Sequence, residues 1–138
     1  ELAMGVAGNG MALYETISPY TSTFFVFSDH CRPTIRLAGL MGIPVTYVFT
    51  HDSFYVGEDG PTHQPVEQTA TLRLIPNMDV WRPCDTVEST VAWARSIERK
   101  EGPSTLIFSR QNLPFQKRDA TTIKLIDKGG DIFYEQIW

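Results

Sequence analysis

Apolar runs and amphipathic stretches alternate along the first 108 residues of the chain. Short runs of β-branched and aromatic residues, apolar on both faces, are typical of buried parallel strands. Longer stretches with apolar residues at helical spacing lie between them. We therefore expect strands at 20–27, 44–49, 80–82 and 104–108, and helices at 2–14, 29–41, 65–74 and from Asp85 to Gly102. This alternation predicts an α/β domain with a three-layer arrangement around an open, mainly parallel sheet.

Several residues mark where the predicted helices begin and end. Gly42 ends the helix at 29–41, and Pro65 suits the first position of the helix at 65–74. Asp85 and Glu88 form a capping box at the start of the last predicted helix. We expect one domain over residues 1–115 and, over residues 116–138, a polar tail that leads toward a further domain.

The first helix is unusual because it is small and apolar nearly all round, which predicts that it is buried. It contains Gly5, Gly8 and Gly10. Each glycine lowers helix stability by about 1 kcal/mol relative to alanine, so such residues indicate the close approach of a backbone or a ligand. Because the helical pattern starts at residue 1, we expect the chain to be a piece of a longer polypeptide whose first strand is missing.

Composition excludes several classes of protein. The 138 residues carry a net charge of −4, with scattered charges, so nothing favours a nucleic-acid partner. No apolar run approaches the roughly 20 residues of a membrane span, and no secretion signal is evident. Cys31 and Cys84 are far apart in the sequence and are interpreted as reduced thiols. A cytoplasmic protein without nucleic-acid or membrane partners is expected.

Polar residues follow three of the predicted strands: His30, His51 with Asp52, and Arg110. Ligands of open parallel sheets bind outside the carboxyl ends of the strands. These side chains are therefore expected to converge at one edge of the sheet. The guanidinium of Arg110 suits a phosphate or a carboxylate, although a plain surface cation remains the alternative.

The segment at 50–68 is rich in histidines and acids, among them His51, Asp59 and His63. No spacing typical of a metal site is present, so no metal ligands are assigned. Polar recognition or proton transfer by the histidines is one interpretation. A loop that is merely stabilised by its own His–Asp hydrogen bonds is the other, and the residues alone do not separate the two.

Six motifs together resemble one enzyme family: ELAMG at 1–5, YTSTF at 20–24, THDS at 50–53, GEDGPTHQPVEQ at 57–68, WRPCD at 81–85 and SRQ at 109–111. They are similar to the central, pyrimidine-binding domain of transketolase, and the resemblance covers nearly the whole chain. The resemblance implies a thiamine diphosphate-binding fold and a Mg-dependent transfer of a two-carbon ketol unit from a ketose phosphate to an aldose phosphate. It also implies a homodimer in which the cofactor lies between this domain and the diphosphate-binding domain of a partner subunit, with the Mg ligands in that absent domain.

The resemblance also assigns cofactor residues. Glu1 matches the catalytic glutamate that hydrogen-bonds the ring nitrogen of the aminopyrimidine. Phe24 matches the ring that stacks on the pyrimidine, and Phe27 lines the same pocket. His30 falls where the family usually has a tyrosine, which leaves its role open.

Four further residues match substrate-binding positions of the family. His51 and Arg110 match ligands of the substrate phosphate, and Asp59 matches a ligand of a sugar hydroxyl. His63 matches the histidine near the reacting carbon, where it suits proton transfer. The isolated chain is expected to be inactive and to expose an apolar interface. Another thiamine diphosphate enzyme, of the dihydroxyacetone synthase or deoxyxylulose phosphate synthase type, and a non-catalytic binding module of the same fold are the alternatives.

Overall fold

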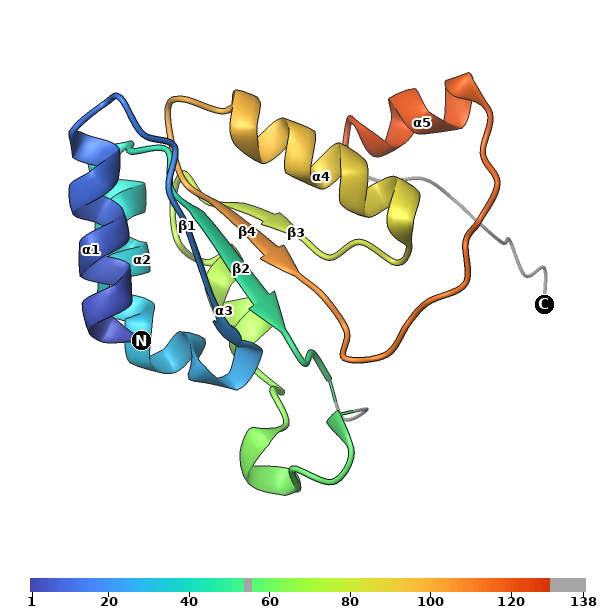
Figure 1. The fold of residues 1–138 in the computed structure, drawn as a ribbon, viewed down its shortest axis with the longest axis horizontal. Coiled ribbons are helices and arrows are strands. Elements are labelled where there is room, and N and C mark those ends of the chain that lie inside the picture. The colour runs from blue at the N-terminus through green and yellow to red at the C-terminus, as the bar shows by residue number, and fades with distance from the viewer. Residues whose placement is uncertain (54–55, 130–138) are drawn as a thin grey trace.

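The computed structural model describes residues 1–53 and 56–129 (Figure 1). A four-stranded sheet in the order β1-β2-β4-β3 lies at its centre, and each neighbouring pair is parallel. The strands are β1 Tyr20–Phe24, β2 Thr46–Thr50, β3 Asp79–Trp81 and β4 Ser104–Ile107. The predicted α/β class and parallel sheet are confirmed, and the four predicted strands are present with shifted bounds.

Helices cover both faces of the sheet (Figure 1). On one face, α1 Leu2–Leu13, α2 Ser28–Met41 and α3 Gln68–Arg73 enclose the main core. Alternate residues of the central strand region, Val45, Tyr47 and Phe49, point into that core. On the other face lie α4 Thr86–Glu98 and α5 Ala120–Ile126. The structure therefore has the three layers that were predicted.

The helix at the start of the chain is present but is buried on one stripe only. Gly5, Gly8, Asn9 and Ala12 face inward. Leu2, Val6, Met11 and Leu13 are about half exposed, so the predicted complete burial is wrong for this chain. A Cβ at Gly5 would lie 2.2 Å from Thr34 Oγ1, which explains why glycine stands there.

Two predicted boundaries are wrong. The strand expected to reach residue 27 ends at Phe24, and Phe25–Phe27 forms a 3-10 turn that leads directly into α2. Phe25 turns into the core and contacts Phe49 at 5.5 Å between ring centroids, which ends the strand. The helix expected from Pro65 begins at Gln68. The Gln68 side chain accepts a hydrogen bond from the Val66 N–H, so the two residues before the helix form a separate turn.

The polar tail contains a helix that the sequence pattern did not predict, α5, which packs against α4 (Figure 1). Asp119 caps it by accepting a hydrogen bond from the Thr122 N–H. Residues 130–138, which include the second half of the predicted turn at 129–130, lie outside the described residues.

Candidate functional site

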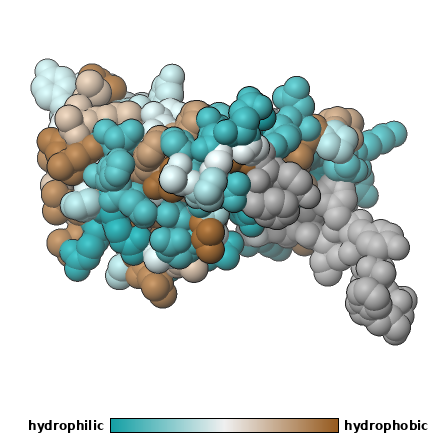
Figure 2. All heavy atoms as spheres, turned by 90° about the horizontal axis from the view of Figure 1, so that it is seen from below, coloured by the Kyte–Doolittle hydropathy of each residue, from teal (hydrophilic) through white to brown (hydrophobic). Residues whose placement is uncertain are grey.

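The carboxyl ends of the parallel strands gather the predicted site residues at the lower edge of the sheet (Figure 1). Phe24 ends β1, His51 directly follows β2, and Arg110 lies just beyond β4. Seen from this side, hydrophilic residues occupy the middle of the surface and apolar residues gather at the end where α1 and α2 lie (Figure 2). The expected convergence on one edge is therefore present at the level of the backbone.

The carboxylate of Glu1 lies where α1, the end of β1 and the start of α2 meet. Its Oε1 accepts a hydrogen bond from Thr23 Oγ1 at 3.4 Å, and its Oε2 lies 3.4 Å from His30 Nδ1. Glu1 occupies the N-cap position of α1 but does not cap the helix with its side chain. Its carboxylate is therefore turned toward the sheet edge, where it can serve a ligand.

Nearly parallel aromatic rings lie beside that carboxylate. Phe24 stacks on His51, with 3.6 Å between ring centroids and 15° between ring planes. Phe27 lies 6.2 Å from Phe24 and 5.5 Å from His30, again almost parallel to both. The rings of His63 and Phe27 form a T-shaped contact, with 5.4 Å between their centroids. The fold thus brings together all three histidines and two of the phenylalanines, from positions up to 39 residues apart in the sequence.

The segment after β2 holds its histidines through threonines. His51 Nδ1 lies 2.9 Å from Thr50 Oγ1, and His63 Nδ1 lies 2.9 Å from Thr62 Oγ1. The His–Asp hydrogen bonds considered from the sequence are not what stabilises this loop within the described residues. The threonine hydroxyl at each Nδ1 leaves Nε2 of each ring to other partners.

Asp59 and Arg110 lie farther from this group. Arg110 is paired with Glu58, Nη2 to Oε1, at 3.1 Å, and the two side chains are 40% and 84% exposed. Asp59 is exposed on the same loop. Among the described residues, no contact joins Asp59 or Arg110 to the aromatic group. The structure therefore brings six of the eight predicted site residues into one cluster and leaves these two at its margin.

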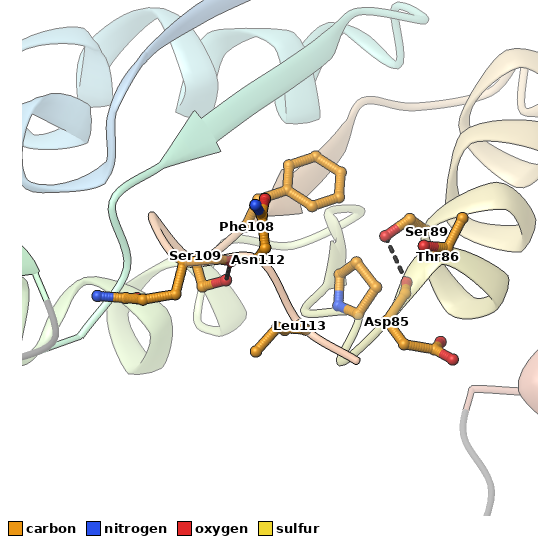
Figure 3. Close-up of a pocket in the computed structure, with 9 residues that line it drawn as sticks. Asp85, Thr86, Ser89, Phe108, Ser109, Asn112 and Leu113 are labelled. Atoms are coloured by element: carbon orange, nitrogen blue, oxygen red, sulfur yellow. Dashed lines mark hydrogen bonds between the residues drawn. The ribbon is translucent and has the colours of Figure 1, made fainter. Parts of the chain in front are cut away.

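A cleft of about 380 Å³ opens beside Arg110, between the end of β4 and the start of α4 (Figure 3). Its lining includes Pro83, Phe108, Ser109 and Asn112. The Ser109 hydroxyl already donates to the Gln111 carbonyl, and the Ser89 hydroxyl donates to the Asp85 carbonyl (Figure 3). None of the predicted site residues lines this cleft, so it is separate from the aromatic cluster.

A buried ion pair lies behind the cleft and was missed by the sequence interpretation. Arg118 donates to the carboxylates of Asp85 and Glu88, at 2.6 and 3.0 Å, and the Arg118 and Asp85 side chains are 2% and 0% exposed. Burial opposes ionisation of Asp85, but hydrogen bonds from the Glu88 N–H, Arg118 and the Gln116 N–H outweigh it and lower the pKa of Asp85. Cys84, Asp85 and Glu88 offer potential metal-ligand atoms within 4.8 Å of one another, but the Arg118 guanidinium is already paired with both carboxylates.

The Asp52–Arg82 ion pair was also missed, because nothing in the sequence links two residues from separate strand ends. Asp52 is buried, and its Oδ2 accepts a hydrogen bond from Arg82 Nε. The sequence did contain one signal, since an acid two residues after a buried strand must find a partner if it is buried. Within the described residues no helix is long and apolar enough to cross a bilayer.

The parallel sheet with helices on both faces defines this protein as an α/β domain, and an acid beside stacked rings at the carboxyl edge of the sheet is its candidate functional site. The family model described as the transketolase pyrimidine-binding domain matches residues 1–116. The chain belongs to that family, as the sequence motifs predicted.

Known relatives agree with this membership. The chain is 57% identical over 132 residues to transketolase 2 of Aliivibrio fischeri, covering 96% of this chain and 20% of that protein. A crystal structure of Pichia stipitis transketolase in complex with sedoheptulose 7-phosphate is 40% identical, with a TM-score of 0.90, and the match covers 99% of this chain and 20% of that one. A split-gene transketolase, described as an inactive β4 tetramer, is 27% identical, with a TM-score of 0.72 over 83% of this chain and 36% of its own. The chain thus spans about a fifth of the length of the A. fischeri and P. stipitis proteins.

Proposed function

We propose that this chain supplies the pyrimidine-binding half of a thiamine diphosphate site in a transketolase. The assembled enzyme transfers a two-carbon ketol unit from a ketose phosphate to an aldose phosphate. One observation carries the proposal, namely that the Glu1 carboxylate stands beside the nearly parallel rings of Phe24, Phe27 and His30. Because the chain belongs to the transketolase pyrimidine-binding family, we interpret this arrangement as a site for the pyrimidine ring of the cofactor.

The residues present fit an aminopyrimidine ring. Such a ring is flat and aromatic, and it needs an apolar surface on its face and a hydrogen-bonding carboxyl group at its edge. His51 covers one face of Phe24, but Phe24 and Phe27 are both only partly buried, so their rings offer apolar surface to a further ring. When bound, the cofactor supplies an electron sink for the ketol unit.

Glu1 has the central role in this proposal. Its carboxyl group exchanges a hydrogen bond with a ring nitrogen of the pyrimidine, as the family resemblance implies. Thr23 and His30, at 3.4 Å, hold the two oxygens of that carboxylate in place before the ligand arrives. Phe27 and His30 line the pocket on the side of α2.

The segment after β2 and the end of β4 face the substrate. His51 and Arg110 bind its phosphate, since imidazole N–H and guanidinium groups donate well to phosphate oxygens. Asp59 accepts a hydrogen bond from a sugar hydroxyl, and His63 moves a proton near the reacting carbon. The Glu58 carboxylate paired with Arg110 must give way when a phosphate binds there.

The other half of the site is proposed to come from a diphosphate-binding domain of a partner subunit, which also holds the Mg ion. The half-exposed apolar side chains of α1 support an interface on this helix in an assembled homodimer. A transketolase of this type works in the cytoplasm. A pyrimidine-binding domain tested alone is expected to be inactive, since the proposed site needs residues of the partner subunit.

Glu1→Gln tests the proposal in the complete enzyme assembled with its diphosphate-binding domain. Glutamine has no carboxyl group that can hold or release a proton. The substitution should therefore lower kcat by about 100-fold or more while leaving the fold intact. Ketol transfer between sugar phosphates and circular dichroism give the two readouts. Near-normal turnover in this variant would refute the assigned role. Transfer from a different donor by the wild-type enzyme would instead favour another thiamine diphosphate enzyme.

A further inference from the structure

Asp52 lies between two residues with a left-handed backbone, His51 with φ of 60° and Ser53 with φ of 64°. This conformation is unfavourable for residues with a side chain. It persists where the surrounding structure fixes the backbone, and such places cluster at functional sites. The strained backbone after β2 therefore indicates that neighbouring groups hold the chain there.

Two interactions of Asp52 hold the backbone where the chain leaves β2. Its backbone N–H donates to the Phe108 carbonyl at 3.1 Å and so continues the pairing of β2 with β4 past the strand ends. Its carboxylate, with the side chain 10% exposed, accepts from Nε of Arg82, which directly follows β3. Because the strand order is β2-β4-β3, this ion pair joins two strands that are not neighbours, across the end of the strand between them.

The Asp52–Arg82 ion pair lies next to the cluster of aromatic rings. His51, one residue before Asp52, stacks on Phe24 at 3.6 Å, and Thr50 fixes its Nδ1. A change in the backbone at Asp52 would rotate His51 away from Phe24 and displace the start of the loop that carries His63. The ion pair thus controls the direction in which the loop departs.

We propose that Asp52 and Arg82 form a positioning pair that holds His51 in place to bind the substrate phosphate. This inference rests on the proposed function, because it uses the phosphate role of His51. Neither residue of the pair touches the substrate. The pair acts through His51, by fixing the strained backbone on either side of Asp52.

The complete enzyme carrying Asp52→Asn or Arg82→Gln tests the pair by comparing an aldose phosphate with the same aldose lacking phosphate. We expect KM for the aldose phosphate to rise about tenfold and kcat to change less than about threefold, because a phosphate contact made equally in the ground state and the transition state contributes to KM and not to kcat. KM for the unphosphorylated aldose should stay within about twofold. Equal changes for both acceptors would mean a merely structural role and would overturn the proposal.

A second readout does not depend on activity. Diethyl pyrocarbonate modification of each histidine, mapped by mass spectrometry, should rise several-fold at His51 in Asp52→Asn and stay constant at His30. Unchanged modification at His51 would overturn the proposal, even if the wild-type enzyme showed no ketol transfer and the proposed function itself failed.

Two further variants complete the design. Arg82→Lys keeps the charge and should bind the aldose phosphate more tightly than Arg82→Gln does. Equal affinity in the two variants would contradict the role of the ion pair. Asp127→Asn breaks an exposed ion pair with Arg95, far from the site, and should change neither KM nor His51 modification. If Asp52→Asn does not fold, Arg82→Gln carries the test, since the Arg82 side chain is 51% exposed.

Discussion

The two helical layers of this domain are attached to the same sheet by different physical means. The α1/α2 layer packs closely through Gly5 and Gly8 and through a buried polar network. In that network the Tyr47 hydroxyl donates to Asn9 Oδ1 at 2.7 Å, and the Asn9 amide donates to the Thr34 carbonyl at 2.9 Å. The α4/α5 layer also buries apolar side chains, such as Ala92 and Ile126, but it adds ion pairs from Arg99 to Asp79 of β3 and from Arg118 to Asp85 and Glu88.

The two means of attachment suit the groups that each layer positions. Glu1 begins α1 and His30 lies on α2, so the distance between them depends on how closely these two helices pack. Uncharged hydrogen bonds and van der Waals contact fix that distance without regard to salt or acid. The second layer anchors the segment after β4, where the charges of Arg118, Asp85 and Glu88 bind two chain segments about 30 residues apart. Its attachment is therefore sensitive to charge.

The largest effect is expected from Arg118→Ala. Removing the guanidinium leaves the buried Asp85 carboxylate without its cation, which typically costs about 3–5 kcal/mol. Amide hydrogen exchange of the complete protein should show lost protection in α5 and the first turn of α4, with α1 unchanged. Arg95→Ala, which breaks only exposed ion pairs with Asp127 and Glu98, is the matched control and should change little. Equal exchange in both variants would contradict the comparison.

A smaller effect is expected from Gly5→Ala. The new Cβ would lie 2.2 Å from Thr34 Oγ1 and 3.0 Å from Thr34 Cβ, so α1 must move away from α2, at a cost of about 1–3 kcal/mol. Because Glu1 moves with α1, cofactor affinity should fall as well. Gly10→Ala is the control on the same helix, since nothing lies within 4 Å of its Cβ position. That variant should gain up to about 1 kcal/mol from helix propensity. Stabilisation by both substitutions would show that α1 and α2 are not in close contact.

The smallest effect is expected in the pH dependence of the free energy of unfolding, which should have opposite directions in the two layers. The lowered pKa of Asp85 means that its contribution is present above the ordinary aspartate value of 3.8 and is lost as pH falls through the folded value. Burial raises the pKa of Cys31 from 9.0 to about 11, and burial also raises the pKa of Tyr47. The α1/α2 layer therefore loses stability as pH rises from 9.0 through about 11.

Urea unfolding across the pH range, with Asp85→Asn and Tyr47→Phe as the two reference variants, measures this contrast. Asp85→Asn should flatten the acid side only, and Tyr47→Phe should reduce the slope on the alkaline side only, where Cys31 still titrates. If either variant flattened both sides, the two layers would not respond independently to pH.

Sequence patterns predicted most of the fold and most of the cluster for definite reasons. Buried strands are continuous apolar runs, and the carboxyl ends of parallel strands meet at one edge, so the approach of His51 to the end of β1 followed from topology. The exact end of β1 did not follow, because Phe24, Phe25 and Phe27 are equally apolar and only packing decides which ring turns into the core. The start of α3 was misplaced because Pro65 suits a turn as well as a helix start.

The sequence by itself determined the α/β class, the order of elements as far as β4, the family and the identity of the candidate site residues, because these depend on local periodicity and on motifs. Only the tertiary structure decided that Arg118 reaches Asp85, that Asp52 reaches Arg82 across β4, and that Phe24 and His51 stack. Each of these contacts joins residues 27 to 33 positions apart in the chain. Such pairing depends on how strands and helices are placed in space, which no local pattern of hydrophobic and polar residues specifies.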